Sequence, residues 1–513
     1  MAAGRTEFEL KFTASPEAGA GLPSSRFFAA VAPSGGAWER LTSTYFDTAD
    51  GVLAASGLSL RLREEGASLI QAVKVRGESP AARTEYETEI ATARDFPVRT
   101  SPREVHAAIA SAGELVEIAG TVVDRWSTII EFRGAQIELA VDLGRAERRD
   151  GDGRVLSAPL AEAELELIAG ERKAVFDFAR LMLDNAPLRL AAGTKLDAAL
   201  GLGRSAIPKY RMAPLQSSAS AGELLNASLT ATASRLTGLH GAVVDLRRPE
   251  GVHQMRVALR RFRAVERIFR RHLGNDEIRS LAMRAKGIAA ALAPARDWDV
   301  FIGETLAVVS GDPSAPPGLR QLKAAAEAER ARAWAEAVEI LSDPAFTHFT
   351  LDLLEAGTLA IWRAGAAETL KKPLAAFAPK ALDRALRKTM KMAAQIRSNG
   401  PSAADDLAAL HPLRIALKKL RYPLQTFKCL YPKAARKDYM QALSALQASL
   451  GVVNDAVVAQ GLADRASEGG GVEVMRAAGF ISGYKAAQAR YAAQEIDAAW
   501  DAFEKMTPFW KLD

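Results

Sequence analysis

Charged residues recur at every second position in several short segments of the first 205 residues. Glu7, Glu9 and Lys11 are spaced in this way, and glutamates occupy positions 162, 164 and 166. Residues two positions apart face the same side of a β-strand, so each segment would give one whole face to charge. Carboxylate oxygens suit a divalent cation, whereas Arg and Lys groups suit phosphate oxygens.

Further segments repeat this spacing and keep acidic residues apart from basic ones. The sets are Arg61 with Arg63, Lys74 with Arg76, Glu85 with Glu87 and Glu89, and Glu138 with Asp142. For any single strand, a solvated charged face is the simpler interpretation. The segregation of the whole set instead favours a closed barrel with carboxylates on one interior wall and cations on others. Because unpaired buried charge is costly, a bound cation and phosphate chain would complete the charge balance.

Short strands are the elements that would position these residues. Alternating segments predict antiparallel strands over 7–12, 58–63, 69–75, 83–90, 127–132, 136–143 and 161–168. Turn residues separate them, and short helices are expected near 101–112 and 171–186.

From about residue 218 the pattern changes to long Ala-, Leu- and Arg-rich stretches with helical periodicity, which predicts an all-α domain. This half contains an internal repeat, because residues 252–263 align with 410–421 at an offset of 158. The same offset relates Phe269 to Phe427 and Asp297 to Asp455. We therefore expect two similar helical bundles packed as a pseudo-symmetric pair.

Each repeat carries a basic stripe along one helix face. The members are His253, Arg256, Arg260 and Arg263 in the first copy, and His411, Arg414, Lys418 and Arg421 in the second. A solvated stripe is the alternative for one helix, but its repetition favours a polyanion site. Nucleic acid is disfavoured because the stripe has no aromatic residues for base stacking, and zinc is disfavoured because no further His or Cys has ligand spacing.

Charge differs between the two halves of the chain. Residues 1–205 hold 24 basic against 30 acidic residues, and the remainder holds 43 against 31. We therefore divide the chain into a catalytic domain at 1–205, a linker at 206–217 and a basic helical domain at 218–513. An acidic half is consistent with cation binding, and a basic half with a polyanion.

Other features bear on the compartment. The single cysteine, Cys429, excludes an intramolecular disulfide and favours a reducing environment. The first residues lack the apolar core of a signal peptide, and no stretch of ~20 apolar, charge-free residues stands out as a membrane span. We expect a cytoplasmic protein without a membrane partner, and we make no prediction of its oligomeric state.

In the first half, the ordered motifs resemble the CYTH, or triphosphate tunnel metalloenzyme, family. They are Glu7 to Lys11, Tyr45 to Thr48, Leu60 to Arg63, Glu85 to Glu87, Ala140 to Gly144 and Ala163 to Leu167. The resemblance implies an eight-stranded antiparallel tunnel that hydrolyses a triphosphate with Mg²⁺ or Mn²⁺.

Matching positions imply a role for each tunnel residue. The implied metal ligands are Glu7, Glu9, Glu164 and Glu166. The implied phosphate-binding residues are Lys11, Arg61, Arg63, Lys74, Arg125, Arg133 and Lys195. Asp142 and Glu87 would orient metal-bound water or brace the basic side chains. The family often has a Ser-Lys-Ser type motif where this chain has Thr194-Lys195-Leu196.

The helical half resembles the CHAD domain, which implies two four-helix bundles whose His and basic residues bind inorganic polyphosphate. The segment Arg296-Asp297-Trp298-Asp299-Val300 is similar to a CHAD motif, whereas the second copy begins with Asn454 and lacks the Arg. The two halves are therefore unequal.

Together the resemblances imply a protein similar to bacterial inorganic triphosphatases, with a fused polyphosphate-binding module and an association with polyphosphate granules. Two alternatives stay open. The tunnel could act on thiamine triphosphate or a nucleoside triphosphate, or cyclise ATP as a class IV adenylate cyclase does. The chain could also be a non-catalytic polyphosphate-binding or granule-targeting protein, although glutamate pairs at both ends of the tunnel domain favour an enzyme.

Overall fold

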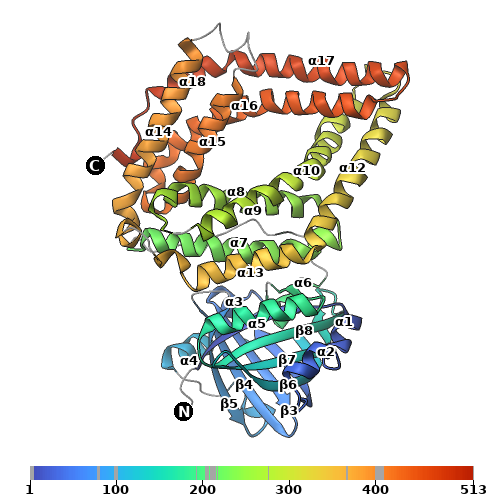
Figure 1. Cartoon of the computed structure of the whole chain (residues 1–513), viewed down its shortest axis with the longest axis vertical. Coiled ribbons are helices and arrows are strands. Elements are labelled where there is room, and N and C mark those ends of the chain that lie inside the picture. Colours follow the sequence, from blue (N-terminus) through green and yellow to red (C-terminus); the bar gives the residue numbers. More distant parts are fainter. Residues whose placement is uncertain are drawn as a thin grey trace. The chain divides into compact units, whose positions relative to one another are not determined.

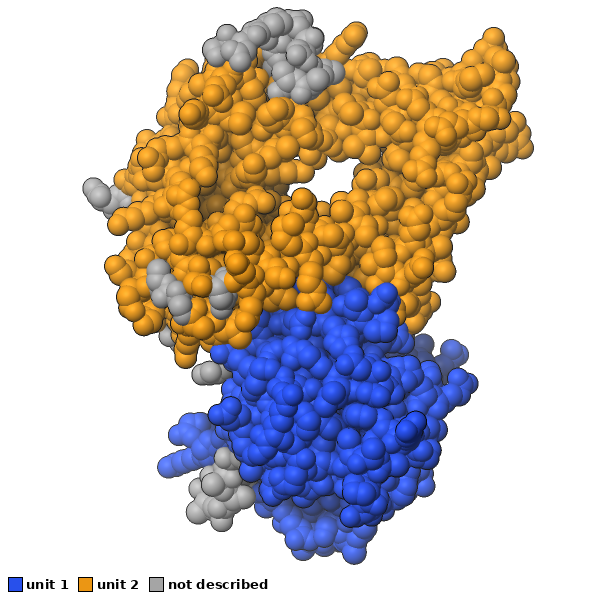
Figure 2. Space-filling model, in the orientation of Figure 1, with its two compact units in different colours: residues 1–208, 233–239, 343–359 blue, residues 209–232, 240–342, 360–513 orange. Residues whose placement is uncertain are grey.

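The computed structural model describes residues 5–77, 81–97, 102–191, 193–202, 207, 215, 218–274, 276–312, 314–364, 368–398 and 410–511. The chain forms two compact units (Figures 1 and 2). Unit 1 contains residues 1–208, 233–239 and 343–359, and unit 2 contains the remainder. The predicted linker at 206–217 lies outside the described residues except for positions 207 and 215.

A closed antiparallel barrel forms the centre of unit 1 (Figure 1). Its strands are β1 (Arg5–Thr13), β2 (Ala37–Asp47), β3 (Leu58–Glu65), β4 (Ser68–Arg76), β5 (Ala82–Ile90), β6 (Val116–Phe132), β7 (Ala135–Arg149) and β8 (Val155–Ala169). The order is β5-β4-β3-β2-β6-β7-β8-β1, and pairing of β1 with β5 closes the barrel. A short strand, β9 (Arg189–Leu190), adds to β1. The predicted eight-stranded barrel is confirmed.

Helices cover the outside of this barrel because the residues between the charged positions are apolar. The helices of this part are α1 (Pro16–Gly21), α2 (Arg26–Val31), α3 (Val52–Ala55), η1 (Ala93–Asp95), α4 (Arg103–Ala110), α5 (Arg172–Asn185) and α6 (Lys195–Gly201). On β1, Phe8 and Phe12 are buried on the outward face. The Phe8 ring lies 5.7 Å from the ring of Phe176 on α5, so α5 backs the strand that carries Glu7 and Glu9.

The rest of the chain is helical, as the sequence predicts. The elements are α7 (Ala221–Val244), α8 (Pro249–Phe269), η2 (Arg270–His272), α9 (Glu277–Ala291), α10 (Ala293–Val300), the π-helix η3 (Phe301–Leu306), α11 (Ala307–Ser310), α12 (Leu319–Ser342), α13 (Pro344–Thr358), η4 (Ile361–Arg363), η5 (Glu368–Lys371), α14 (Leu374–Ser398), α15 (Leu410–Phe427), η6 (Lys428–Leu430), α16 (Lys433–Ser467), α17 (Val472–Gln494), α18 (Ile496–Glu504) and η7 (Phe509–Lys511).

The internal repeat corresponds to two helices that pack on each other, α8 and α15. The equivalent residues Phe269 and Phe427 are both buried. Their rings lie 5.0 Å and 6.2 Å from the ring of Phe377 on α14. The two copies therefore meet around a shared aromatic contact.

One helix differs from our expectation about membrane spans. By length and composition alone, α16 is long and apolar enough to cross a membrane. Its buried residues, including Tyr439, Leu443, Leu446 and Leu450, recur at helical spacing, and it packs against α12, α15, α17 and α18. One such helix is weak evidence for a membrane span, because the core helix of a helical bundle passes the same test.

Candidate functional site

Strand register brings the alternating charged residues of β1 and β8 together inside the barrel. Glu9 lies opposite Glu166, and Lys11 lies opposite Glu164. Directly paired residues on antiparallel strands face the same side of the sheet. The two acidic sequence segments therefore form one continuous charged surface.

Glu164 is the centre of this surface. Its Oε1 accepts hydrogen bonds from Lys11 Nζ at 2.5 Å and from Lys195 Nζ at 2.6 Å, and its Oε2 accepts one from Arg125 Nη2 at 2.5 Å. Burial alone would raise the pKa of this carboxyl group. The positive charges of Lys11, Lys195 and Arg125 outweigh that effect and hold the pKa well below its ordinary value. Glu164 is therefore an anion that holds three cations together.

Lys195 reaches this cluster from the first turn of α6. Thr194 and Asp197 form a capping box that fixes the start of the helix. Lys195 Nζ lies 2.7 Å from Asp142 Oδ2 and 3.3 Å from Glu162 Oε2. Although burial would lower the pKa of Lys195, the three carboxylates around it raise the pKa well above its ordinary value.

Asp142 also accepts two hydrogen bonds from Arg125, at 2.8 Å and 2.7 Å. Its contacts with Arg125 and Lys195 are those of a residue that braces basic side chains, which is one of the two roles we considered for it.

A second charged cluster lies on β1, β3, β4 and β5. Lys74 Nζ lies 3.0 Å from Glu7 Oε2 and 2.9 Å from Glu85 Oε2, and Arg61 Nη2 lies 3.1 Å from Glu85 Oε1. Burial and a hydrogen bond with Glu85 raise the pKa of Glu7 to about 8. The pKa of Glu85 falls to about 2, because the hydrogen bond with Glu7 and the charges of Lys74 and Arg61 outweigh its burial.

Glu85 was not among our predicted site residues, and neither was Arg83, whose Nη1 lies 3.4 Å from Glu9 Oε1. The alternation over 83–90 already placed Glu85 on the charged face, and that signal could have identified it. The predicted residue Glu87 is more peripheral, because 43% of its side chain is exposed. Arg63 Nη2 lies 3.2 Å from it and 2.9 Å from Glu65.

The structure places Arg133 outside the tunnel, which corrects its predicted role in phosphate binding. Arg133 occupies the turn between β6 and β7 with a φ of 49°, and 65% of its side chain is exposed. Its Nη1 donates a hydrogen bond to Asp177 on α5 at 2.6 Å. Residues at a hairpin turn do not follow the two-residue alternation of the strands. Arg133 therefore does not share the interior face on which Arg125 lies.

Apolar residues close part of the barrel interior. Tyr45 lies opposite the tunnel residue Arg61, so its ring faces inward. It packs with Leu41, Val123 and Leu160 in a buried cluster that includes Ala199 of α6. The helix that supplies Lys195 therefore also closes off the apolar part of the interior.

The predicted metal ligands have suitable donor chemistry for Mg²⁺ or Mn²⁺, because all four are carboxylates and these ions prefer oxygen. Glu7 and Glu9 lie on β1, and Glu164 and Glu166 lie on the neighbouring strand β8. Within the described parts of the chain, no three Asp, Glu, His or Cys groups converge as a ready metal site. The carboxylate oxygens of Glu164 instead accept hydrogen bonds from Lys and Arg side chains.

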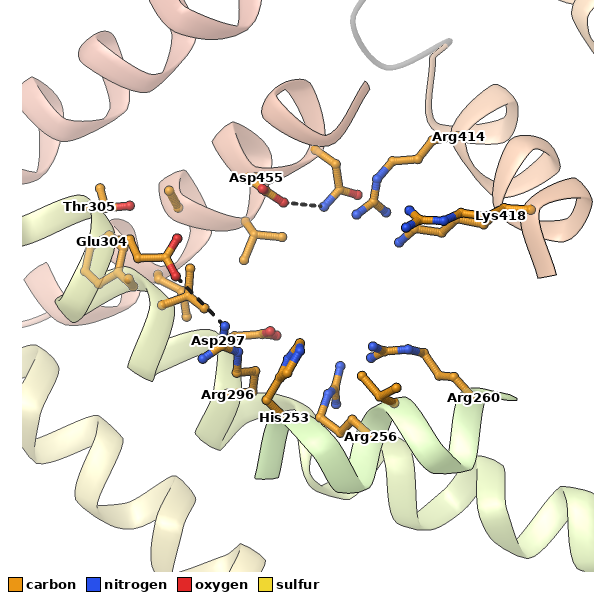
Figure 3. Close-up of a pocket in the computed structure, with 18 of the residues that line it drawn as sticks. His253, Arg256, Arg260, Arg296, Asp297, Glu304, Thr305, Arg414, Lys418 and Asp455 are labelled. Atoms are coloured by element: carbon orange, nitrogen blue, oxygen red, sulfur yellow. Dashed lines mark hydrogen bonds and ion pairs between the residues drawn. The ribbon is translucent and has the colours of Figure 1, made fainter. Parts of the chain in front are cut away.

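The basic stripes of α8 and α15 line a cavity of about 790 Å³ in unit 2 (Figure 3). Figure 2 shows unit 2 hollowed and open through its middle. The charged residues of the lining are His253, Arg256, Arg260, Arg261, Arg296, Asp297, Glu304, Arg414, Lys418, Arg421, Asp455 and Lys485. The lining is strongly cationic, and such a cavity attracts polyanions.

Six of the eight predicted polyphosphate-binding residues line this cavity, and Arg263 and His411 do not. Burial and the charge of Arg267 on the same helix lower the pKa of Arg263. His411 is exposed in the first turn of α15. Lys485, from α17, lies outside the repeat, and the sequence pattern did not indicate it.

Crowding of positive charge changes the titration of Lys418. Burial, and then the neighbouring charges of Arg414 and Arg260, lower the pKa of Lys418 to about 8. Burial likewise raises the pKa of Asp297, in spite of Arg256 and Arg296 beside it. An anionic ligand would relieve the repulsion among these cations.

Hydrogen bonds to α12 hold helix α10 in place. Asp299 Oδ1 accepts a hydrogen bond from Arg330 Nε at 2.7 Å and another from Trp334 Nε1 at 3.1 Å, both on α12. This anchorage directs Arg296 and Asp297 toward the cavity (Figure 3). The equivalent of Asp299 in the second copy is Val457, which is exposed. The second copy therefore lacks the carboxylate that anchors α10, and the two halves differ in this respect too.

The barrel and the helical fold of the remaining chain agree with comparisons to known proteins. Residues 5–199 match the model of the CYTH domain, and residues 227–464 match the model of the CHAD domain. The chain therefore joins a segment that matches the CYTH domain to a segment that matches the CHAD domain. CYTH domains are triphosphate tunnel metalloenzymes, a class that acts on triphosphate substrates and depends on a divalent metal.

Solved structures show similarity to each half. The CHAD domain of the plant Ricinus communis is 27% identical over 59% of this chain and 98% of that chain, with a TM-score of 0.50. PptA from Streptomyces chartreusis is 17% identical over 55% of this chain and 100% of that chain, with a TM-score of 0.42. A Hippeastrum protein, described as a candidate adenylyl cyclase with a dominant triphosphatase activity, is 22% identical over 38% of this chain and 94% of that chain, with a TM-score of 0.28.

Proposed function

We propose that the tunnel hydrolyses inorganic triphosphate to diphosphate and phosphate with Mg²⁺ or Mn²⁺, and that the helical cavity binds inorganic polyphosphate. The observation that carries the first part is the convergence of Lys11, Arg125 and Lys195 on Glu164 inside a closed barrel. These buried cations are paired with carboxylates, and phosphate oxygens are anions that can take the place of those partners. A short phosphate chain supplies such an anion along the length of the tunnel.

One tunnel can bind both a metal ion and phosphate if its Lys and Arg groups change partners from carboxylates to phosphate oxygens. The basic groups now neutralise carboxylates, and phosphate oxygens would compete for the same groups. Glu164 and Glu9, relieved of Lys11, would then offer oxygen atoms to a divalent cation. When bound, that cation neutralises phosphate charge and makes water a better nucleophile.

The residues of the chain position the substrate and stabilise charge. Attack of water forms one P–O bond as the bridging P–O bond breaks, and diphosphate leaves. Negative charge on the transferred phosphoryl group and on the leaving oxygen is met by Arg and Lys groups in a loose transition state. Lys11, Arg125 and Lys195 surround one point of the interior, and Arg61 and Lys74 surround another, so both ends of a short chain would be held.

The interior favours an inorganic substrate over an organic triphosphate. The charged part of the lining offers ionic and hydrogen-bonding partners, which suit phosphate groups at every position. Tyr45, whose ring could otherwise stack on a base, is buried in the apolar cluster with Leu41 and Val123. That arrangement gives an organic group no open aromatic surface there.

A substrate comparison tests this proposal. Tripolyphosphate, ATP and thiamine triphosphate would be supplied to the full chain with Mg²⁺ or Mn²⁺, with and without EDTA, and phosphate, diphosphate and cyclic AMP would be measured. We expect the highest kcat/KM for tripolyphosphate and loss of turnover with EDTA. A higher kcat/KM for either organic triphosphate, or formation of cyclic AMP, would replace inorganic triphosphate as the substrate, and no turnover at all would favour the non-catalytic alternative.

The cavity of unit 2 supports the second part of the proposal. Its cations come from α8, α10, α15 and α17, so they surround a ligand instead of forming one flat surface. A flexible phosphate chain fits a cavity of about 790 Å³, whereas rigid duplex DNA needs an open basic face.

Titration of the full chain with polyphosphate and with duplex DNA of equal phosphate content would distinguish these ligands. We expect tighter binding of polyphosphate, a steep fall in affinity as salt rises, and loss of binding when Arg256, Arg260, Arg414 and Lys418 are replaced by Ala. A matched control replaces Arg279, Arg284, Lys286 and Arg332 by Ala, because none of these residues lines the cavity. Tighter binding of DNA, or polyphosphate binding untouched by the cavity substitutions, would contradict the proposal.

A further inference from the structure

Helix α13 belongs to the barrel unit although it lies far beyond the barrel in the sequence. Residues 343–359 group with residues 1–208 in unit 1, and they fall inside the segment 227–464 that matches the CHAD domain. Asp343 alone separates α12 from α13, and its side chain caps α13 by accepting a hydrogen bond from the backbone N–H of Ala345. The helical sequence thus supplies a defined element to the catalytic unit.

Complementary charged stripes join α13 to α5. On α5, Lys173, Arg180 and Asp184 follow one helix face, and on α13 the matching residues are His348, Asp352 and Glu355. Arg180 Nη2 donates hydrogen bonds to Asp352, at 2.7 Å, and to Glu355. Lys173 Nζ lies 3.3 Å from Glu355 Oε1, and His348 Nε2 lies 3.0 Å from Asp184 Oδ1. The two helices therefore run antiparallel.

Glu355 is the residue that this contact most depends on. Only 9% of it is exposed, and it lies against two basic side chains of α5. A carboxylate buried to this extent is tolerated because those cations compensate its charge. Its partners are specific positions of the barrel unit, so the contact fixes the position of α13 along α5.

Another part of the α5 surface, beside the charged stripe, packs against the charged strand of the tunnel. Phe176 of α5 packs on Phe8, which lies between Glu7 and Glu9 on β1. Strand β9, which α13 also contacts, pairs with the end of β1, and the backbone N–H of Ala191 donates to Lys11 O at 2.8 Å. The chain then continues to Thr194 and Lys195.

We propose that α13 positions the catalytic tunnel, with Glu355 as its principal positioning residue, by holding α5 and β9 against β1. The inference rests on the proposed function, because it takes β1 and Lys195 as part of the catalytic machinery. Glu355 itself lies outside the tunnel and acts through the elements that it contacts. The segment that matches the CHAD domain thereby contributes to the chemistry of the CYTH domain.

Kinetics of the full chain with tripolyphosphate and Mg²⁺ test this inference. We expect Glu355→Gln to lower kcat by about tenfold or more, as small displacements of catalytic groups do, with KM changed much less. Glu147→Gln is the matched control, since Glu147 pairs with Arg145 and lies on the outward face of β7. Unchanged kcat in Glu355→Gln would overturn the inference, even if the melting temperature fell, because the contact would then be only structural.

Two further measurements keep the inference separate from folding and from the proposed function. Asp352→Asn and His348→Ala weaken the same contact at more exposed positions, and we expect smaller falls in kcat from properly folded protein. Hydrogen exchange can be measured without any activity. The amides of residues 7–12, 189–191 and 193–195 should exchange faster in Glu355→Gln than in Glu147→Gln. Equal exchange in both variants would overturn the inference whether or not tripolyphosphate is hydrolysed.

Discussion

The sequence alone assigned the roles of the charged tunnel side chains incompletely. Alternation along a strand predicts which face a residue occupies, but not which side chain it contacts. Alternation on β1, β5 and β8 predicted which residues share the interior face. It did not predict that Glu85 would lie against both Lys74 and Arg61, because the register between β4 and β5 decides the contact with Lys74. Arg133 was misplaced for a related reason, since a hairpin turn interrupts the alternation at Arg133-Gly134.

A pair of arginine substitutions tests this distinction. Arg61→Ala should raise KM for tripolyphosphate and lower kcat together, because a buried phosphate clamp acts in both the ground state and the transition state. The overall fall in kcat/KM should be at least about tenfold, as expected for loss of a charged hydrogen bond of ~1.5–3 kcal/mol. Arg133→Ala should leave both constants within about twofold, because its side chain is exposed on the outside and an exposed ion pair contributes little.

Steady-state kinetics of the two variants provide the check. Equal effects of the two substitutions would contradict our placement of Arg133 outside the tunnel and Arg61 within it.

In the helical cavity, the lowered pKa of Lys418 predicts pH dependence of polyphosphate binding. Lys418 is positive below its pKa of about 8 and loses its charge as pH rises through that value. Affinity should therefore fall between about pH 7 and pH 9, and binding near pH 8 should take up a proton, because the polyanion favours the charged form. Lys418→Arg should bind equally well across this range, since arginine keeps its charge.

Calorimetric titrations in buffers of different ionisation enthalpy would measure both the affinity and the proton uptake. A fall in affinity that persists unchanged in Lys418→Arg would show that another group causes it.

At the scale of elements, periodicity predicted whether a segment is a helix or a strand better than it predicted where each element begins and ends. The strands and the long helices follow from alternation and from helical spacing, and α4 and α5 lie close to the helices expected at 101–112 and 171–186. β2 was not among the predicted strands, although its partners β3 and β6 were, because its first residues are exposed and do not alternate clearly. The π-helix η3, which directs Glu304 and Thr305 to the cavity, has no sequence signal in the repeat.

Helix α6 offers a test at this scale, because its capping box positions Lys195. Thr194→Ala removes the side chain that accepts a hydrogen bond from the backbone N–H of Asp197. The loss should cost ~1 kcal/mol of stability and lower kcat, since Lys195 would no longer be held between Asp142 and Glu164. Thr194→Ser keeps the cap and should behave like the natural protein.

Melting temperatures and kcat of the two variants would be compared directly. If Thr194→Ala melted at a lower temperature with kcat unchanged, the cap would stabilise α6 without positioning Lys195.

At the scale of the whole molecule, the sequence predicted an acidic first half and a basic second half, but not that residues 233–239 and 343–359 group with the barrel. Residues 343–359 are helical by periodicity, and nothing in their own pattern indicates that they group with the barrel. That assignment depends on the match between charges on α13 and α5, which are more than 150 residues apart. Long-range charge complementarity of this kind becomes visible only when the fold is known.

The central claim is that the charged tunnel is a metal-dependent triphosphatase, and Glu164→Gln tests it most directly. The substitution keeps the shape of the side chain but removes the charge that Lys11, Arg125 and Lys195 share. The measurement is phosphate release from tripolyphosphate at saturating Mg²⁺ by the natural chain and by Glu164→Gln, each with a circular dichroism spectrum to verify folding. We predict EDTA-sensitive release by the natural chain and a fall in kcat of about a hundredfold or more in the folded variant, as for loss of a group essential to the transition state. Release that resists EDTA, or a folded Glu164→Gln that retains most of its activity, would contradict the account.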